Sequence, residues 1–227
     1  METTSRPTGP DELEALLRRA FPHGRDDVRS VLFETVELRR IEAGQSVTDQ
    51  RDAADVILVT AGHIGLVRTT LDGRQIMPRI VTTGELLAIS SGERSSPAGS
   101  IALTASEVAA WKPAEVRLLA THDAGFALDL LDQVVDSFET IVTSIDGLVH
   151  QNAALRVARI LQQHQTLFFG DPPTVSQAHL PVMVGASRAM TQRAFRLLEA
   201  REIVARTPRG GLVLRDASAL EATAAGR

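Results

Sequence analysis

The most regular pattern of apolar and polar positions in this sequence lies between residues 123 and 150. Apolar side chains recur there in alternating steps of four and three residues, which is the repeat of a helix with one apolar face. A helix of this length reaches about 40 Å at about 1.5 Å per residue, so we expect it to form a parallel seam between two copies of the chain. The residues expected in that seam are Ala127, Leu131, Val134, Phe138, Ile141, Ile145 and Leu148.

A second apolar line runs along the same segment, through Leu130, Val135, Val142 and Val149. This line allows the alternative that the helix packs only on its own domain. The two uses can also coexist, with one line in a dimer seam and the other on the domain of the same chain.

The segment from residue 34 to 111 contains short apolar runs separated by glycine-containing turns, which is typical of an antiparallel β-roll or sandwich. Two helices are predicted before it, over residues 10–21 and 26–33, because Pro10-Asp11 and Asp26-Asp27 are helix start signals. The strands are expected at Glu37 to Ile41, Val56 to Thr60, His63 to Arg68 and Gln75 to Val81.

Near the end of the chain, the pattern predicts two short helices joined by a tight turn. Gly185 provides the positive φ angle that such a turn requires, and the Ser187 hydroxyl can cap the second helix. The side chains expected to pack inward are Val182, Val184, Met190, Ala194, Leu197 and Leu198. Two apolar strands around a Pro-Arg-Gly-Gly turn follow, so the whole segment indicates a winged helix-turn-helix.

The outer face of the second helix carries side chains suited to duplex DNA. Arginine pairs with guanine edges, glutamine with adenine edges, and both bind phosphates. We expect Arg188 and Arg193 to contact guanines and Gln192 to contact an adjacent base. The residues expected at phosphates are Ser187, Arg196, Arg206 and Arg209. Two such helices in a homodimer would enter major grooves about 34 Å apart, so the operator should be an inverted repeat.

The distribution of charge supports this assignment. The 227-residue chain has a formal net charge of −4, but residues 151–227 contain ten arginines and five acidic residues. Residues 1–150 contain fourteen basic and twenty-three acidic residues. Only the C-terminal part is therefore attractive to phosphate.

Other features narrow the class of protein. The chain has no cysteine, which excludes disulfides and thiolate metal sites. No apolar run approaches the roughly 20 residues that span a bilayer, and the polar start is not a secretory signal, so we expect a cytoplasmic protein without a membrane partner. We find no phosphate-binding loop, dinucleotide fingerprint or nucleophile elbow, and therefore expect no enzyme activity.

The six histidines are scattered without the spacing of a metal site, and we expect neither a metal nor a cofactor. Two alternatives stay open at this point. One is a sensor gated by haem or another small molecule, with His63 as the haem ligand. The other is a dimeric module that docks proteins and does not bind DNA.

The order of these parts resembles the CRP/FNR family of bacterial transcription regulators over almost the whole chain. The segment GASRAMTQRAFRLLE is similar to the family's recognition-helix pattern, and AGHIGLVRTTLDGRQIMPRIVTTGELL to its roll. The resemblance implies an α+β protein with an N-terminal antiparallel, jelly-roll-like β-roll, a long dimerisation helix and a C-terminal winged helix-turn-helix. The corresponding domains are residues 1–122 (cyclic-nucleotide-binding-like effector domain), 123–151 (dimerisation helix) and 152–227 (DNA-binding domain). An activator of this type would also contact RNA polymerase.

Several positions depart from the family pattern, and two of these departures bear on binding. Ala189 stands where the family usually has a base-reading glutamate, so the familial base preference does not transfer. In the effector pocket, Gly84-Glu85 matches a turn better than the phosphate cassette, and the family's arginine is missing. We therefore do not expect cyclic AMP to bind in the usual mode, and the effector stays unknown. The residues that occupy the pocket positions are Leu87, Ala88, Ile89, Arg94, Gly99 and Ser100.

Overall fold

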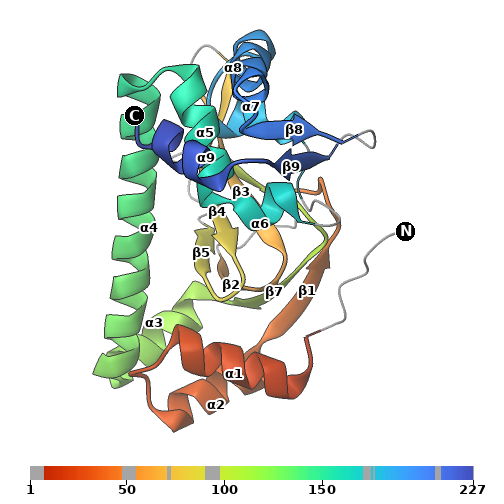
Figure 1. Cartoon of the computed structure of the whole chain (residues 1–227). Helices are drawn as coiled ribbons and strands as arrows, with labels where there is room; N and C mark the ends of the chain where they lie inside the picture. Colours follow the sequence, from red (N-terminus) through yellow and green to blue (C-terminus); the bar gives the residue numbers. More distant parts are fainter. Residues whose placement is uncertain are drawn as a thin grey trace. The chain divides into compact units, whose positions relative to one another are not determined.

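The computed structural model describes residues 8–47, 55–70, 73–89, 98–170, 175, 177–207 and 211–226. The chain forms two compact units. One contains residues 1–67 and 79–140, and the other contains residues 68–78 and 141–227. Helices and antiparallel strands make up the described residues (Figure 1), which confirms the predicted α+β class.

Seven described strands form the predicted β-roll, as two sheets, and the strands of the larger sheet pair antiparallel. The larger sheet has the strand order β1-β7-β2-β5, and the smaller has the order β4-β3-β6. Non-sequential neighbours of this kind are expected of a roll, in which the chain crosses between sheets. The strands are β1 (Glu37–Ile41), β2 (Asp55–Ala61), β3 (His63–Thr69), β4 (Gln75–Thr82), β5 (Leu86–Ile89), β6 (Ala98–Ala102) and β7 (Ser106–Trp111).

The register places β2 in the interior of the larger sheet. Ile57 lies opposite Ala110 of β7 on one side and opposite Leu87 of β5 on the other, and all three are buried. Gly62 makes the turn from β2 to β3 with a φ angle of 87°. A Cβ atom there would come within 2.7 Å of the Ala105 carbonyl oxygen, so this turn requires glycine.

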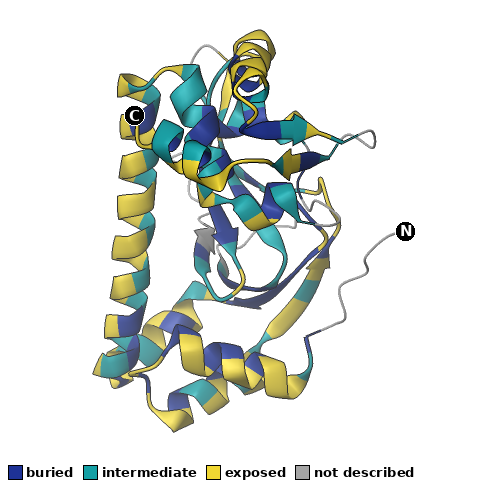
Figure 2. Cartoon of the chain, viewed as in Figure 1, coloured by how far each residue is buried: buried dark blue, intermediate teal, exposed yellow. Residues whose placement is uncertain are grey.

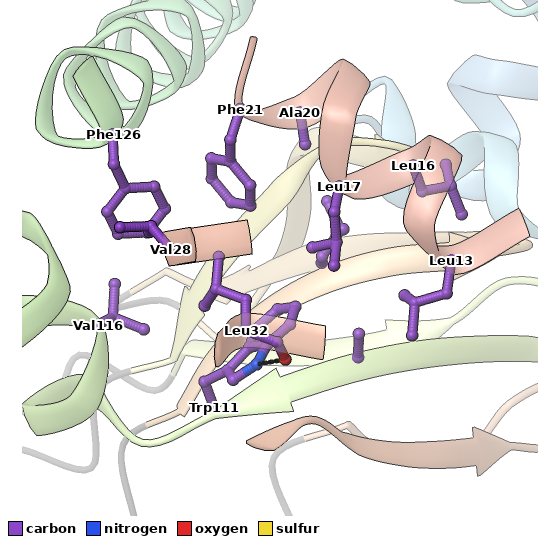
Figure 3. Packing of buried hydrophobic residues seen from close by; sticks show 12 residues of the cluster. Leu13, Leu16, Leu17, Ala20, Phe21, Val28, Leu32, Trp111, Val116 and Phe126 are labelled. Atoms are coloured by element: carbon purple, nitrogen blue, oxygen red, sulfur yellow. Dashed lines mark hydrogen bonds between the residues drawn. The ribbon is translucent and has the colours of Figure 1, made fainter. Parts of the chain in front are cut away.

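Three short helices cover one face of the larger sheet: α1 (Pro10–Ala20), α2 (Asp26–Thr35) and α3 (Pro113–His122). Helix α1 begins with Pro10 and carries acidic residues in its first turn and basic residues in its last, which favours a helix at both ends. Its apolar residues pack with Val28 and Leu32 of α2 around Trp111 (Figure 3). The indole Nε1 donates to the Leu32 carbonyl oxygen at 2.8 Å, so the buried ring has its polar group satisfied.

Helix α4 (Ala124–His150) is the predicted long helix and has 27 residues. Phe126 anchors its first turn, because its ring is fully buried and meets the ring of Phe21 edge to face at 4.9 Å. Figure 2 shows exposed residues along most of α4. Within the described residues, no helix is both long enough and apolar enough to cross a bilayer.

The second unit contains the helices and the small sheet that follow α4. Asn152 caps α5 by accepting from the Leu155 amide at 2.9 Å. Apolar residues of α5, α8 and α9 form the core, among them the fully buried Leu161, Phe195 and Leu220. The elements are α5 (Ala153–Gln163), α6 (Gln165–Phe169), a 3₁₀ turn (Gln177–His179), α7 (Leu180–Met183), α8 (Arg188–Ala200), β8 (Val204–Arg206), β9 (Leu212–Leu214) and α9 (Ala217–Ala224).

Candidate nucleic-acid interface

The turn between α7 and α8 has the predicted chemistry. Gly185 has a φ angle of 57°, and a Cβ atom at this position would collide with the Leu148 side chain. The Ser187 side chain accepts from the Met190 amide at 3.2 Å, so it caps α8 as expected. Pro181 occupies the first turn of α7, where a missing amide donor costs no helical hydrogen bond.

The inward face of α8 differs from the prediction at two positions. Met190 and Leu197 are 51% and 53% exposed, so their assignment to the core is wrong. Thr191 and Phe195 are buried in their place, with Ala194 and Leu198 as predicted. The two stripes are neighbours on a helix and have almost the same spacing, and the buried one includes Thr191, whose hydroxyl donates to the Ser187 carbonyl oxygen at 3.0 Å.

The outward face of α8 has the four predicted polar side chains on its surface. Arg188, Gln192, Arg193 and Arg196 are all exposed, and with Ala189 they line an open depression of about 360 Å³. No described residue forms a hydrogen bond or an ion pair with the guanidinium group of Arg188, Arg193 or Arg196. These three positive charges are therefore not neutralised by a described acidic side chain and can bind an external anion.

The wing is a two-stranded antiparallel sheet. Arg206 of β8 lies opposite Leu212 of β9, and the Thr207 amide donates to the Gly211 carbonyl oxygen at 2.9 Å. Arg209 lies outside the described residues. Arg206 is half-exposed, but its guanidinium group already contacts α8: it forms an ion pair with Glu199 at 3.1 Å and a hydrogen bond with Gln192 at 2.8 Å.

Arg156 of α5 holds the turn before α8 and was not predicted to have a role. Its Nε donates to the Val184 carbonyl oxygen at 2.7 Å, and its Nη1 donates to the Gln151 carbonyl oxygen. Burial lowers the pKa of this guanidinium group from its usual value. The side chain thus connects the residues just after α4 to the helix-turn-helix within the same unit.

The predicted seam residues on α4 divide into two groups. Leu131, Val134, Phe138 and Ile145 are 47–67% exposed, whereas Ala127, Ile141 and Leu148 are partly covered by their own chain. The structure instead exposes members of the second apolar line, namely Val135, Val142 and Val149, together with Leu128. A continuous exposed line with steps of three and four therefore runs through Leu128, Leu131, Val135, Phe138, Val142, Ile145 and Val149, which we call the α4 stripe.

Two polar side chains that were not predicted to have a role attach α4 to its own domain. Both oxygens of the buried Asp129 accept hydrogen bonds, with the His23 and Gly24 amides 3.0 Å from Oδ2. Gln133 donates to the Ala20 carbonyl oxygen and accepts from the Leu86 amide. Asp129 and Gln133 are four residues apart and so lie on one face of the helix. This spacing is the only sequence signal for their role, and it does not show whether the polar face points inward or is exposed.

Part of the predicted effector pocket is described. Gly84 and Glu85 form the turn between β4 and β5, as expected, and the Glu85 carboxylate accepts from the Thr82 amide at 3.0 Å. Leu87 is buried in the core between the two sheets. The Ser100 hydroxyl is buried and has no hydrogen-bond partner among the described residues. Arg94 lies outside the described residues, as do the side chains of Ala88 and Ile89, and Gly99 is half-buried in β6.

His63 begins β3 and is half-buried. Burial lowers the pKa of its imidazole below the usual value. Its backbone amide donates to the Thr104 hydroxyl at 3.0 Å, and its Nδ1 is buried without a hydrogen-bond partner among the described residues. No cluster of three potential metal-binding histidine, aspartate or glutamate residues is found within the described ranges.

Comparison with known proteins gives structural matches and no sequence matches. No protein-family model and no curated protein sequence matches the chain. A putative CRP/FNR-family transcriptional regulator from Eubacterium rectale superposes with a TM-score of 0.70 at 12% identity, over 88% of this chain and 95% of that one. The c-di-GMP-responsive global regulator CLP from Xanthomonas campestris gives a TM-score of 0.68 at 18% identity, over 85% and 100%. A CRP-family transcriptional regulator from Thermus thermophilus gives 0.64 at 20%, over 82% and 96%. The chain therefore has the fold of CRP/FNR-type regulators.

Proposed function

We propose that this chain is a sequence-specific, DNA-binding transcription regulator of the CRP/FNR type, which acts as a homodimer on an inverted-repeat operator. The observation that carries this proposal is the outward face of α8. Three guanidinium groups without described partners project from a helix that is capped by Ser187 and backed by a two-stranded wing. This arrangement suits insertion of α8 into a major groove.

In this mode, Arg188 and Arg193 bind guanine edges and Gln192 reads an adjacent base. Arg196 lies at the outer side of α8 and binds a phosphate. The Ser187 hydroxyl accepts from the Met190 amide, and its own hydrogen is still free to donate to a phosphate oxygen. Arg209 lies outside the described residues, and its assignment to a phosphate comes from the sequence.

The α4 stripe is the surface that we assign to a second copy of the chain. Its seven residues alternate in steps of three and four over the whole helix, which is the spacing of a coiled-coil seam. The steps of three begin at Leu128, Val135 and Val142, and Val149 is the next residue of this series. Valine at such positions is typical of coiled coils of two parallel helices. A parallel pair of α4 helices would place the two α8 helices in the symmetric arrangement that an inverted repeat requires.

The effector stays unassigned in this proposal. Leu87 packs in the core between the sheets and Gly84-Glu85 forms a turn, which supports the view that cyclic AMP is not bound in the family's usual mode. The predicted domain limits at residues 122 and 151 are kept as part of the proposal, and RNA polymerase is a partner only if the protein is an activator.

Selection of binding sites from a randomised duplex pool, with the full chain at low ionic strength, tests the function. We expect the recovered sites to be inverted repeats. Arg188→Ala should weaken binding by about 1–3 kcal/mol and relax the preference at one base pair of each half-site. Arg201→Ala is the matched control, because it removes an exposed arginine at the end of α8 that lies outside the proposed face.

Two results would overturn the proposal. The first is failure of the unchanged chain to enrich any duplex from the pool. The second is an Arg188→Ala variant that keeps the full base preference and loses no more affinity than Arg201→Ala, because a general loss of positive charge would then explain the whole effect.

A further inference from the structure

The guanidinium group of Arg206 contacts three residues of α8. Its Nη2 donates to Oε1 of Gln192 at 2.8 Å, its Nε pairs with the Glu199 carboxylate at 3.1 Å, and its Cζ lies 4.9 Å from the centre of the Phe195 ring. The three partners follow one another along α8 in steps of three and four, so they lie in one line on the helix. Arg206 therefore lies along α8, although it belongs to the wing.

These contacts hold the guanidinium group in place. Phe195 is buried beneath it, and the Glu199 side chain is only 29% exposed. The planar fork of an arginine can bond to two acceptors while it stacks on a ring, which lysine cannot do. In contrast, no described residue bonds to Arg196, the other arginine that we expect at a phosphate. The two arginines are therefore not equivalent.

The bond with Arg206 determines which way the Gln192 amide faces. A guanidinium group has donors and no acceptor, so the amide atom that faces Arg206 must be the oxygen. The amide nitrogen is then at the other end of the group, and no described residue accepts a hydrogen bond from it. Gln192 consequently offers donors to a base in front of α8.

This orientation changes the base that glutamine selects. Glutamine recognises adenine by accepting from N6 and donating to N7 at the same time. The amide oxygen has two lone pairs, and the bond from Arg206 occupies one of them and holds the oxygen toward the wing, so the first of these bonds is disfavoured. The glutamine can still donate to O6 and N7 of guanine or to O4 of thymine, because these edges present acceptors.

We propose that Arg206 is a positioning residue that biases base specificity: by holding the Gln192 oxygen toward the wing, it presents the amide donors to the base and favours guanine or thymine over adenine. The inference rests on the proposed function and replaces the expectation that Arg206 binds a phosphate. The inference concerns the base preference at one position of each half-site. It does not change the expected affinity of the other protein–DNA contacts.

The test is a comparison of base preferences from the same duplex selection for four proteins: the unchanged chain, Arg206→Ala, Gln192→Ala and the double variant. We expect guanine or thymine at the Gln192 position for the unchanged chain. Arg206→Ala should raise the adenine-to-guanine ratio there by about tenfold, since the freed amide can then form both bonds. Arg206 substitution should leave the preference unchanged when Gln192 is already alanine.

Two further variants keep the result interpretable. Arg206→Met retains the alkyl chain over Phe195 without any donor, and it should shift the preference in the same way even if Arg206→Ala unfolds. Glu199→Gln removes the ion pair but leaves the bond between Arg206 and Gln192, so it should keep the original preference.

The inference fails if Arg206→Ala and Arg206→Met bind all sequences more weakly with unchanged base preference, because Arg206 would then act at a phosphate. It also fails if the unchanged chain already selects adenine at the Gln192 position. A chain that binds no duplex overturns the proposed function together with this inference, so the two failures are distinguishable.

Discussion

Arg156 donates through Nε to the backbone carbonyl oxygen of Val184 at 2.7 Å, and this bond joins α5 to the turn that precedes α8. The same guanidinium group also bonds to the Gln151 carbonyl oxygen, next to the end of α4. The geometry of the turn therefore depends on a side chain outside the helix-turn-helix.

Arg156→Met should remove both bonds and leave the Val184 and Gln151 carbonyl groups without this donor. An unpaired buried acceptor costs about 1–3 kcal/mol, so we expect the free energy of unfolding to fall by about that amount in denaturant titration. Arg201→Met, at an exposed arginine, should change it by no more than about 0.5 kcal/mol. Equal stabilities of the two variants would contradict this role of Arg156.

Asp129→Ala should destabilise the N-terminal unit, because the buried carboxylate accepts from the backbone amides of His23 and Gly24. We expect a loss of about 3 kcal/mol, since hydrogen bonds to a charged acceptor are lost and two amides are left unpaired. Asp132→Ala, on the exposed side of the same helix, should stay within about 0.5 kcal/mol of the unchanged chain. Thermal unfolding measures both, and a small effect at Asp129 would show that water replaces the carboxylate.

The stability of the roll should depend on pH through His63. Burial lowers the pKa of this side chain below 6.5, its value in the unfolded chain. Between the folded and unfolded pKa values the unfolded chain binds more protons, so the stabilising contribution is present above pH 6.5 and is lost as the pH falls. His63→Gln should therefore flatten the decrease in Tm between about pH 7 and about pH 5. The exposed His122→Gln is the control and should keep the slope; parallel curves for all three proteins would exclude His63 as the cause.

The α4 stripe predicts which substitutions separate the two copies. Val142→Asp places a charge inside the proposed seam, where its burial is unfavourable, and should give a monomer. Phe138→Asp should do the same. Thr143→Asp is the matched control, since it is the exposed neighbour outside the stripe, and should leave a dimer. Light scattering gives the mass of each protein, and a dimeric Val142→Asp would refute the stripe as the seam.

Local chemistry explains what could be predicted from the sequence in the helix-turn-helix. Gly185 and Ser187 each act on residues at most three positions away, so their turn and cap are readable without the fold. Two positions of the buried stripe of α8 were predicted wrongly, because Met190 and Leu197 each lie one helical turn from the core residue Ala194 and so also fit an apolar repeat. The contact between Arg206 and Gln192 joins a strand to a helix and has no local signal.

For the long helix α4, too, the sequence pattern predicts the helix but not its contacts with distant parts of the chain. The repeat correctly predicted the helix, but the predicted seam and the α4 stripe have the same alternating steps and share Leu131, Phe138 and Ile145. To decide which line faces a second copy, one has to know which groups bond to the polar face of the helix. Asp129 and Gln133 lie on that polar face and bond to the backbone of residues more than 100 positions earlier in the chain. The spacing of apolar residues gives no indication of such contacts.

The central claim is that two copies of the chain bind one duplex through α8. The most direct test is the dependence of duplex affinity on salt, measured together with the mass of the complex. The proposal predicts one dimer per inverted repeat and a logarithmic affinity that falls by about 0.9 per phosphate contact for each logarithmic unit of salt, with Arg196→Ala reducing that slope. A complex with a single copy of the chain, or no measurable duplex binding at low salt, would contradict it.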